Sequence, residues 1–138
     1  MRTAIDTNVI GALWSREPVS AGLADVLHRA GQEGALVICG PVYAELLAYP
    51  NATRQFADGF LADTRIDVDT IDSRDVWARA GEAFGAYARR RRSSGGGEPK
   101  RLLVDFIVGA HAVARAERLL TLDPDRYRTA FPELELQI

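Results

Sequence analysis

The chain has 138 residues, 47% of them hydrophobic and 26% charged, which is typical of a globular protein, and we expect one domain over residues 1–138. Its formal net charge of −2 excludes a bulk polycation, so any contact with nucleic acid has to come from a local basic patch. The single cysteine excludes an internal disulfide, and the lack of a long apolar run argues against a membrane span. Together with the lack of a signal-peptide pattern, these features favour a cytoplasmic location.

The first half of the chain shows short apolar runs alternating with amphipathic stretches. Gly31 and Gly34 are expected to end the first helix, and Pro50 the second. The patterns predict buried strands over residues 3–5 and 35–39 and a half-exposed strand over residues 65–71. They predict helices over residues 19–30, 41–49 and 51–62.

The second half continues the alternation around one polar loop. The run "RRRRSSGGGEPKR" is interpreted as a mobile loop inside the domain, because the segment that follows it is strongly apolar. Helices are predicted over residues 74–92 and 102–116, and strands over 118–123 and 133–138. The alternation predicts an α/β fold, a three-layer α/β/α sandwich with a mainly parallel central sheet.

Four acidic residues lie next to apolar residues in the sequence. Asp6 follows the first strand, and Asp123 ends the strand "RLLTLD". Glu45 lies among apolar residues at helical spacing in "PVYAELLAY", and Asp105 lies in the almost wholly apolar helix "LLVDFIVGAHAVA". The other acids in polar stretches are interpreted as solvated: Asp58, Asp63, Asp67, Asp69, Asp72 and Asp75.

Each of the four acids also has a structural interpretation. Asp6, or one of the two residues after it, could cap a helix that begins near Val9. Glu45 could be a rim residue, Asp105 a buried carboxylate paired with an arginine, and Asp123 part of an Asp-Pro turn. For Asp105 the sequence offers small neighbours that would leave room beside the carboxylate, at Val108, Gly109 and Ala112.

Taken together, the four acids favour a metal site. Two follow strands and two lie on helices after strands, so they can converge at the carboxyl edge of a parallel sheet. Clustered carboxylates repel each other and need a compensating cation. Oxygen ligands without thiolates select a hard ion, Mg²⁺ or Mn²⁺, which leaves coordination sites for water and phosphate.

The spaced set of motifs resembles a known family. The stretches "AIDTNVI", "PVYAELLAY", "LLVDFIVGAHAVARAERLLTLD" and "YRTAFPELELQI" are similar, in this order, to those of PIN-domain ribonucleases, specifically VapC-type toxins of bacterial type II toxin–antitoxin systems. The resemblance implies that Asp6, Glu45, Asp105 and Asp123 bind Mg²⁺ or Mn²⁺ and are the catalytic residues of an endoribonuclease. It also implies an RNA substrate, a small cognate antitoxin and a homodimer.

The same resemblance assigns supporting roles around these acids. Thr7, Asn8 and Thr121 match polar positions of the family and are expected to position the substrate. The Arg-, Gly- and Ser-rich insertion before Asp105 is longer than the family leads us to expect. Its basic residues could grip the RNA backbone or could simply form a solvated helix end: Arg89, Arg90, Arg91, Arg92, Lys100 and Arg101.

Two other functions fit parts of the sequence. A PIN fold that has lost catalysis could serve as a binding protein, although all four acids are present. A phospho-acceptor receiver module also gathers acids at strand ends, but it needs a lysine at a late strand end, and the only lysine is Lys100. Neither His28 nor His111 has an evident nucleophile or base partner, so His111 is interpreted as structural.

Overall fold

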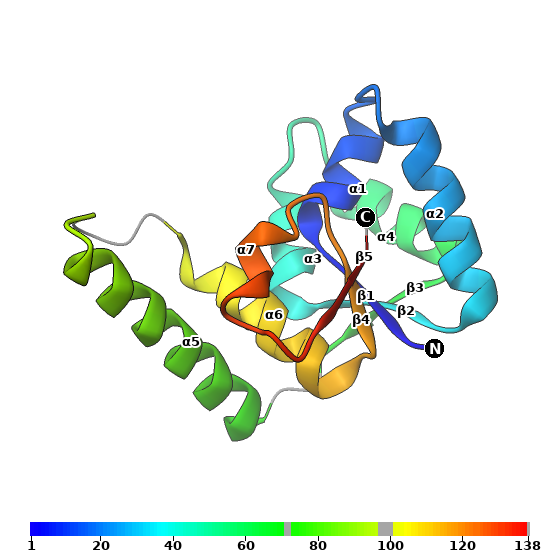
Figure 1. Cartoon of the computed structure of the whole chain (residues 1–138). Helices are drawn as coiled ribbons and strands as arrows, with labels where there is room; N and C mark the ends of the chain where they lie inside the picture. The colour runs from blue at the N-terminus through cyan, green and yellow to red at the C-terminus, as the bar shows by residue number, and fades with distance from the viewer. Residues whose placement is uncertain (71–72, 97–100, 138) are drawn as a thin grey trace.

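A five-stranded parallel sheet forms the centre of the molecule in the computed structural model, which describes residues 1–70, 73–96 and 101–137 (Figure 1). The strands lie in the order β3-β2-β1-β4-β5, and each neighbouring pair is parallel. This confirms the predicted α/β architecture. The strands are β1 (Thr3–Ile5), β2 (Leu36–Cys39), β3 (Ile66–Asp69), β4 (Arg118–Leu120) and β5 (Glu135–Gln137).

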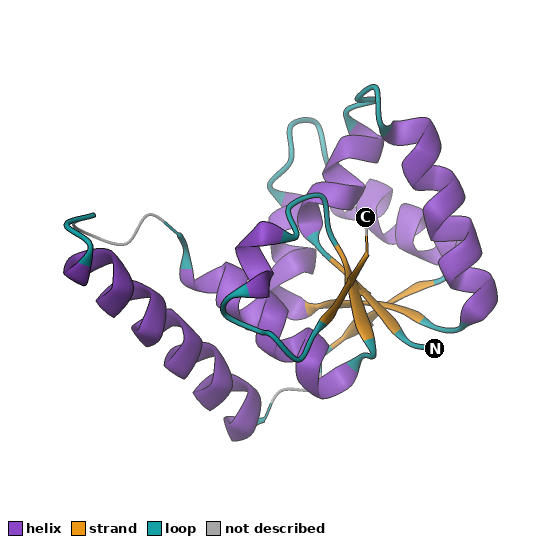
Figure 2. Ribbon diagram, in the orientation of Figure 1, coloured by secondary structure: helices purple, strands orange, loops and turns teal. Residues whose placement is uncertain are grey.

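Helices cover both faces of the sheet and complete the three layers (Figure 2). Helices α1, α2 and α4 lie on one face, and α5, α6 and α7 lie on the other, while α3 contacts both α1 and α6. None of the helices in the described ranges has the length and hydropathy that a membrane crossing requires. The helices are α1 (Thr7–Trp14), α2 (Ser20–Glu33), α3 (Gly40–Leu47), α4 (Arg54–Thr64), α5 (Arg74–Ser93), α6 (Leu103–Arg115) and α7 (Asp125–Arg128).

The central strands are buried on both faces, as continuous apolar runs in a parallel sheet predict. Every residue of β1, β2 and β4 is buried, and Val37, Ile38 and Leu119 have no exposed surface. In the edge strand β3, Ile66 and Asp69 are buried, Asp67 is exposed and Val68 is half-buried, so buried and exposed residues do not alternate regularly. The core therefore lies along β2-β1-β4, the strands whose ends carry Asp6 and Thr121.

Several predicted boundaries differ from the structure. Helix α1 begins at Thr7, directly after β1, so the capping interpretation of Asp6 is correct but the helix starts earlier than Val9. Gly31 lies within α2 rather than ending it, and Gly34 follows that helix. Arg65 ends α4 in a left-handed conformation and does not belong to β3. Of the predicted strand and loop residues, Ile71, Ile138 and residues 97–100 lie outside the described part.

Gly109 does not leave room beside Asp105, contrary to the expectation from its small side chain. A Cβ atom built there would lie 2.2 Å from Cε2 of Phe131, so the aromatic ring occupies the space. Phe131 follows α7, is 1% exposed and packs its ring against α6 as part of the hydrophobic core. The glycine therefore permits α6 to pack against Phe131, and it has no direct role in housing a carboxylate.

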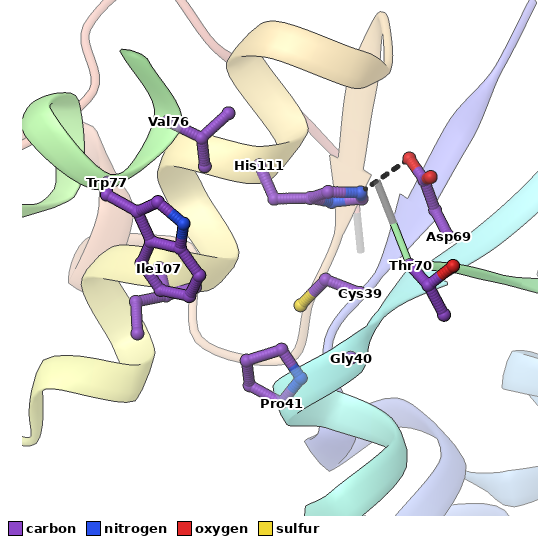
Figure 3. A pocket seen from close by; sticks show the side chains of 9 residues that line it. All are labelled: Cys39, Gly40, Pro41, Asp69, Thr70, Val76, Trp77, Ile107 and His111. Atoms are coloured by element: carbon purple, nitrogen blue, oxygen red, sulfur yellow. Dashed lines mark hydrogen bonds and ion pairs between the residues drawn. The ribbon is translucent and has the colours of Figure 1, made fainter. Parts of the chain in front are cut away.

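The interpretation of Asp69 as a solvated acid is wrong. It is 8% exposed and accepts hydrogen bonds from Arg115 Nε at 2.9 Å and from Arg2 Nη2 at 3.3 Å. His111 Nε2 lies 3.0 Å from the same carboxylate (Figure 3). The alternation of polar and apolar residues in β3 predicts an exposed Asp69. In the structure, His111 and Arg115 of α6 cover its carboxylate. Two of these partners come from α6 and the third, Arg2, directly precedes β1, so only the tertiary packing reveals the set.

His111 is buried, and the expectation that it has no evident partner is wrong, because its imidazole contacts Asp69. Burial lowers the pKa of His111, and the hydrogen bond and charge of Asp69 act in the opposite direction, with Arg115 and Arg2 lowering the pKa further. An unfolded histidine titrates near pH 6.5. The unfolded chain therefore binds more protons than the folded one as pH falls through this value, and folding stability decreases.

We expect His111→Gln to flatten this pH dependence of the free energy of unfolding. Urea unfolding at a series of pH values between about 7.5 and 5 measures the slope. His28→Gln, which changes an exposed histidine on α2, is the matched control and should retain the wild-type slope. Equal slopes in wild type and His111→Gln would contradict the assignment.

Candidate active site

Asp6 lies at the carboxyl end of the central strand β1. Strand β1 lies between β2 and β4. The chain continues from β2 to β3 at one edge of the sheet and from β4 to β5 at the other, so the strand order reverses at β1. In open α/β sheets, ligands bind outside the strand ends at such a reversal of strand order. The position of Asp6 therefore matches the general location of binding sites in this class of fold.

The carboxylate of Asp6 is held by three hydrogen-bond donors. Oδ1 accepts from the Thr7 backbone N–H at 2.8 Å, and Oδ2 accepts from Thr121 Oγ1 at 2.9 Å and from Tyr127 Oη at 2.7 Å. The residue is 4% exposed. Three donors aimed at one carboxylate fix its direction, so Asp6 is pre-oriented.

The predicted polar residues connect Asp6 to its surroundings. Thr7 Oγ1 donates to Glu45 Oε1 at 2.7 Å, so it links the start of α1 to α3. Asn8 Oδ1 accepts from the backbone N–H of Leu122 at 3.1 Å, and Asn8 Nδ2 donates to Thr121 Oγ1 at 3.5 Å. Thr7, Asn8 and Thr121 therefore form a scaffold that ties β1, α3 and the end of β4 together.

Asp105 lies in the first turn of α6, and its side chain is 18% exposed. Burial raises the pKa of its carboxyl, the Arg126 guanidinium lowers it in part, and Asp6 and Glu45 raise it again. Arg126 Nη1 is 3.3 Å from Asp105 Oδ1, so the arginine-paired interpretation of Asp105 also holds. The negative charges of Asp6 and Glu45 therefore add to the effect of burial on this carboxyl.

Asp123 lies beside the carboxylates of Asp6, Glu45 and Asp105 and is not one of their cluster. Its carboxylate binds Arg126 Nη2 at 3.1 Å, and its side chain is 44% exposed. Arg126 therefore bridges Asp105 and Asp123. The Asp-Pro turn interpretation is also correct, because the backbone carbonyl of Asp123 accepts from the backbone N–H of Arg126 as the short helix α7 begins.

Three of the four predicted acids share one cavity of about 430 Å³. Its wall consists of Asp6, Thr7, Asn8, Glu45, Ala48, Tyr49, Pro50, Asp105 and Arg126. As arranged, no three His, Cys, Asp or Glu side chains within the described ranges converge as metal ligands. The donor set nevertheless fits a hard divalent cation, because it offers carboxylate oxygens whose mutual repulsion a cation would relieve.

The basic residues of the long loop fall into two groups. Arg101 lies near the cavity: its Nη1 donates to the carbonyl of Arg126, and its charge lowers the pKa of Asp105. Arg89 to Arg92 lie at the far end of α5, which projects away from the sheet (Figure 1). Three of these four, Arg90 to Arg92, occupy the last turn of α5, where positive charge also suits the helix dipole. Lys100 lies outside the described residues.

Two residues of the site were not found from the sequence. Tyr127 is 1% exposed and donates to Asp6, and Arg126 bridges two of the acids. Both belong to α7, a helix of four residues that is too short for a periodic signal. Their proximity to the acid at position 123 was the available hint, but a contact with Asp6 requires β1 and β4 to be paired.

A second cavity, of about 180 Å³, lies between the ends of β2 and β3 and the helices α5 and α6 (Figure 3). Cys39, Asp69 and His111 line it, a combination that invites comparison with a nucleophilic triad. Burial raises the pKa of the Cys39 thiol to about 11, so the thiolate is not available near neutral pH. This cavity therefore lacks an activated nucleophile.

The fold and the acidic cavity define an α/β protein with a carboxylate site at the strand ends. A family model for the PIN domain matches residues 3–132, and the chain belongs to this family. PIN domains are nucleases, which places the chain among hydrolases acting on nucleic acid, a class that generally uses divalent metal ions. A comparison with curated proteins finds no match.

Solved structures show the same fold at low sequence identity. A chain in the crystal structure of VapBC2 from Rickettsia felis bound to a DNA fragment from their promoter superposes with a TM-score of 0.67 at 20% identity. The alignment covers 99% of this chain and 98% of that one. A chain in the structure of VapBC-1 from nontypeable Haemophilus influenzae gives a TM-score of 0.67 at 20% identity, with 99% and 97% covered.

Proposed function

We propose that this protein is a Mg²⁺- or Mn²⁺-dependent endoribonuclease and the toxin of a toxin–antitoxin pair. The observation that carries the proposal is the shared cavity: Asp6, Glu45 and Asp105 come from three distant segments and line one space at the carboxyl end of the sheet. Asp6 is buried and Glu45 and Asp105 are half-buried, and carboxylates with so little access to water are rarely brought together unless a cation compensates them. The likeness to chains of VapBC complexes supports a cognate antitoxin partner. A cytoplasmic location and a homodimer are further parts of the proposal.

The acidic and polar residues of the cavity would have different roles in this reaction. Asp6 and Asp105 would hold the cation directly, and Glu45 and Asp123 would complete its surroundings, directly or through water. The cation, when bound, supplies positive charge that acidifies an attacking water and stabilises the phosphate in the transition state. Hydrogen bonds from Thr121 and Tyr127 fix the orientation of Asp6 at the cavity wall, and Thr7 orients Glu45. No covalent enzyme intermediate is needed for this hydrolysis.

The receiver-module alternative loses its support from the topology. Receiver modules have the strand order 2-1-3-4-5, whereas this sheet has the order β3-β2-β1-β4-β5. The inactive-PIN alternative remains as the outcome that the experiment can detect.

Cleavage of total RNA tests the proposal. Wild-type protein is assayed with Mg²⁺ or Mn²⁺, after chelation, and after the metal is restored. The Asp6→Asn variant is purified in the same way. We expect cleavage that chelation abolishes, metal restores and Asp6→Asn lacks. Equal cleavage by wild type and variant would indicate a contaminant or another site, and no cleavage by either would favour the inactive binding protein.

We further expect the arginines at the end of α5 to contribute to RNA affinity. Replacing Arg89, Arg90 and Arg92 by Gln should weaken binding and reduce the slope of log affinity against log salt by up to about one unit for each phosphate that is no longer neutralised. All three side chains belong to exposed residues, so folding should be retained. Filter binding across a salt titration measures the slope, with Arg54→Gln, an exposed arginine on α4, as the control. An unchanged slope would assign these arginines to the solvated helix end.

A further inference from the structure

Arg126 reaches two of the acids at once. Its Nη1 lies 3.3 Å from Asp105 Oδ1, and its Nη2 lies 3.1 Å from Asp123 Oδ2. These acids belong to different elements, one to the first turn of α6 and one to the segment after β4. The two terminal nitrogens of one guanidinium therefore hold the carboxylates of separate segments together, as the forked geometry of arginine allows.

The main chain of Arg126 is anchored while its side chain keeps access to solvent. Arg101 Nη1 donates to the Arg126 carbonyl, and the next residue, Tyr127, is buried with its hydroxyl on Asp6. The Arg126 side chain itself is 33% exposed. It can therefore swing away from the carboxylates without disturbing the helix that carries it.

The charge balance of the cavity depends on this side chain. Asp6, Glu45 and Asp105 contribute three carboxylates to the wall, and among the described wall residues Arg126 is the basic one. Burial alone would lower the pKa of the guanidinium, but Asp105 and Asp123 raise it above its ordinary value. Arg126 is therefore charged at every relevant pH and compensates part of the repulsion when no metal is bound.

We propose that Arg126 is an internal counter-ion of the acidic site that competes with the divalent cation for Asp105. This inference rests on the proposed function, because it takes the cavity to be the metal site. Both cations need the same carboxylate oxygens, and two positive charges repel each other at that distance. The guanidinium has to leave Asp105 when the metal binds, so Arg126 stabilises the metal-free protein and lowers its affinity for the metal.

Titration calorimetry with Mn²⁺ on the metal-free protein tests this, with thermal unfolding recorded with and without Mn²⁺. We expect Arg126→Gln to bind Mn²⁺ about three- to tenfold more tightly than wild type, since a competing pair of modest strength is removed. The metal-free variant should unfold at a lower temperature, and the rise in unfolding temperature on adding Mn²⁺ should be larger than in wild type.

Arg128→Gln is the matched control. It removes the same charge from the same helix, but Arg128 is 62% exposed, pairs with Asp125 and does not line the cavity. It should bind Mn²⁺ with nearly wild-type affinity. If Arg126→Gln binds no more tightly than Arg128→Gln, or binds more weakly than wild type, the counter-ion role is overturned while the metal site stands. If wild-type protein takes up no Mn²⁺, the metal site and the proposed nuclease function fail together with it.

Discussion

Asp105→Asn should lower metal-dependent RNA cleavage by at least about 100-fold and leave the metal-free protein as stable as wild type or more stable. The activity falls because a neutral amide is a poor ligand for a hard cation. The stability is retained because burial, Asp6 and Glu45 together outweigh Arg126 and raise the pKa of Asp105. A raised carboxyl pKa means that folding favours the neutral form, so removing the charge relieves a cost of folding.

The two opposite effects distinguish a functional acid from a structural one. Cleavage assays at saturating metal measure the first effect, and thermal unfolding after chelation measures the second. Asp75→Asn, an exposed acid in the first turn of α5, should lose a few tenths of a kcal/mol of stability and no activity. A strongly destabilised Asp105→Asn with normal cleavage would show that this carboxylate serves only its ion pair with Arg126.

Gly109→Ala should destabilise the protein by between about 1 and 3 kcal/mol, although alanine is the better helix former. The added Cβ would lie 2.2 Å from Cε2 of Phe131, a ring that is 1% exposed and also carries the Arg79 guanidinium 4.6 Å from its centroid. The backbone N–H of Phe131 donates to the carbonyl of Tyr127 at 2.8 Å. Displacing the ring therefore pulls on the helix that holds Asp6 in place, and we expect metal affinity to fall as well.

Gly81→Ala provides the comparison for this prediction. Gly81 lies on the exposed side of α5, where a Cβ would meet nothing within 4 Å. This substitution should stabilise the protein by about 0.5–1 kcal/mol through helix propensity alone. Chemical denaturation of both variants and of wild type measures the free energies of unfolding. Stabilisation by both substitutions would show that the core around Phe131 accommodates the methyl group.

The predicted elements that rest on local pattern agree with the structure. Buried strands such as Leu36–Cys39 are continuous apolar runs, and helix starts such as Ser73 carry a side chain that caps the first turn. Short elements were less predictable: the start of α1 and the whole of α7 occupy too few residues for periodicity to appear. The acids at positions 6, 45 and 105 stood out because their apolar surroundings make an unpaired charge costly.

The sequence by itself determined the parallel α/β architecture and the acids that line the cavity. Both signals, runs of apolar residues and charged residues among apolar neighbours, are local and can be recognised from adjacent residues. The tertiary structure alone decided which charges compensate them. Arg126 between Asp105 and Asp123, the basic partners of Asp69 under α6, and the phenol of Tyr127 on Asp6 all join segments far apart in the chain. A charged group's partner depends on how helices cross the sheet, and that packing has no local signature along the chain.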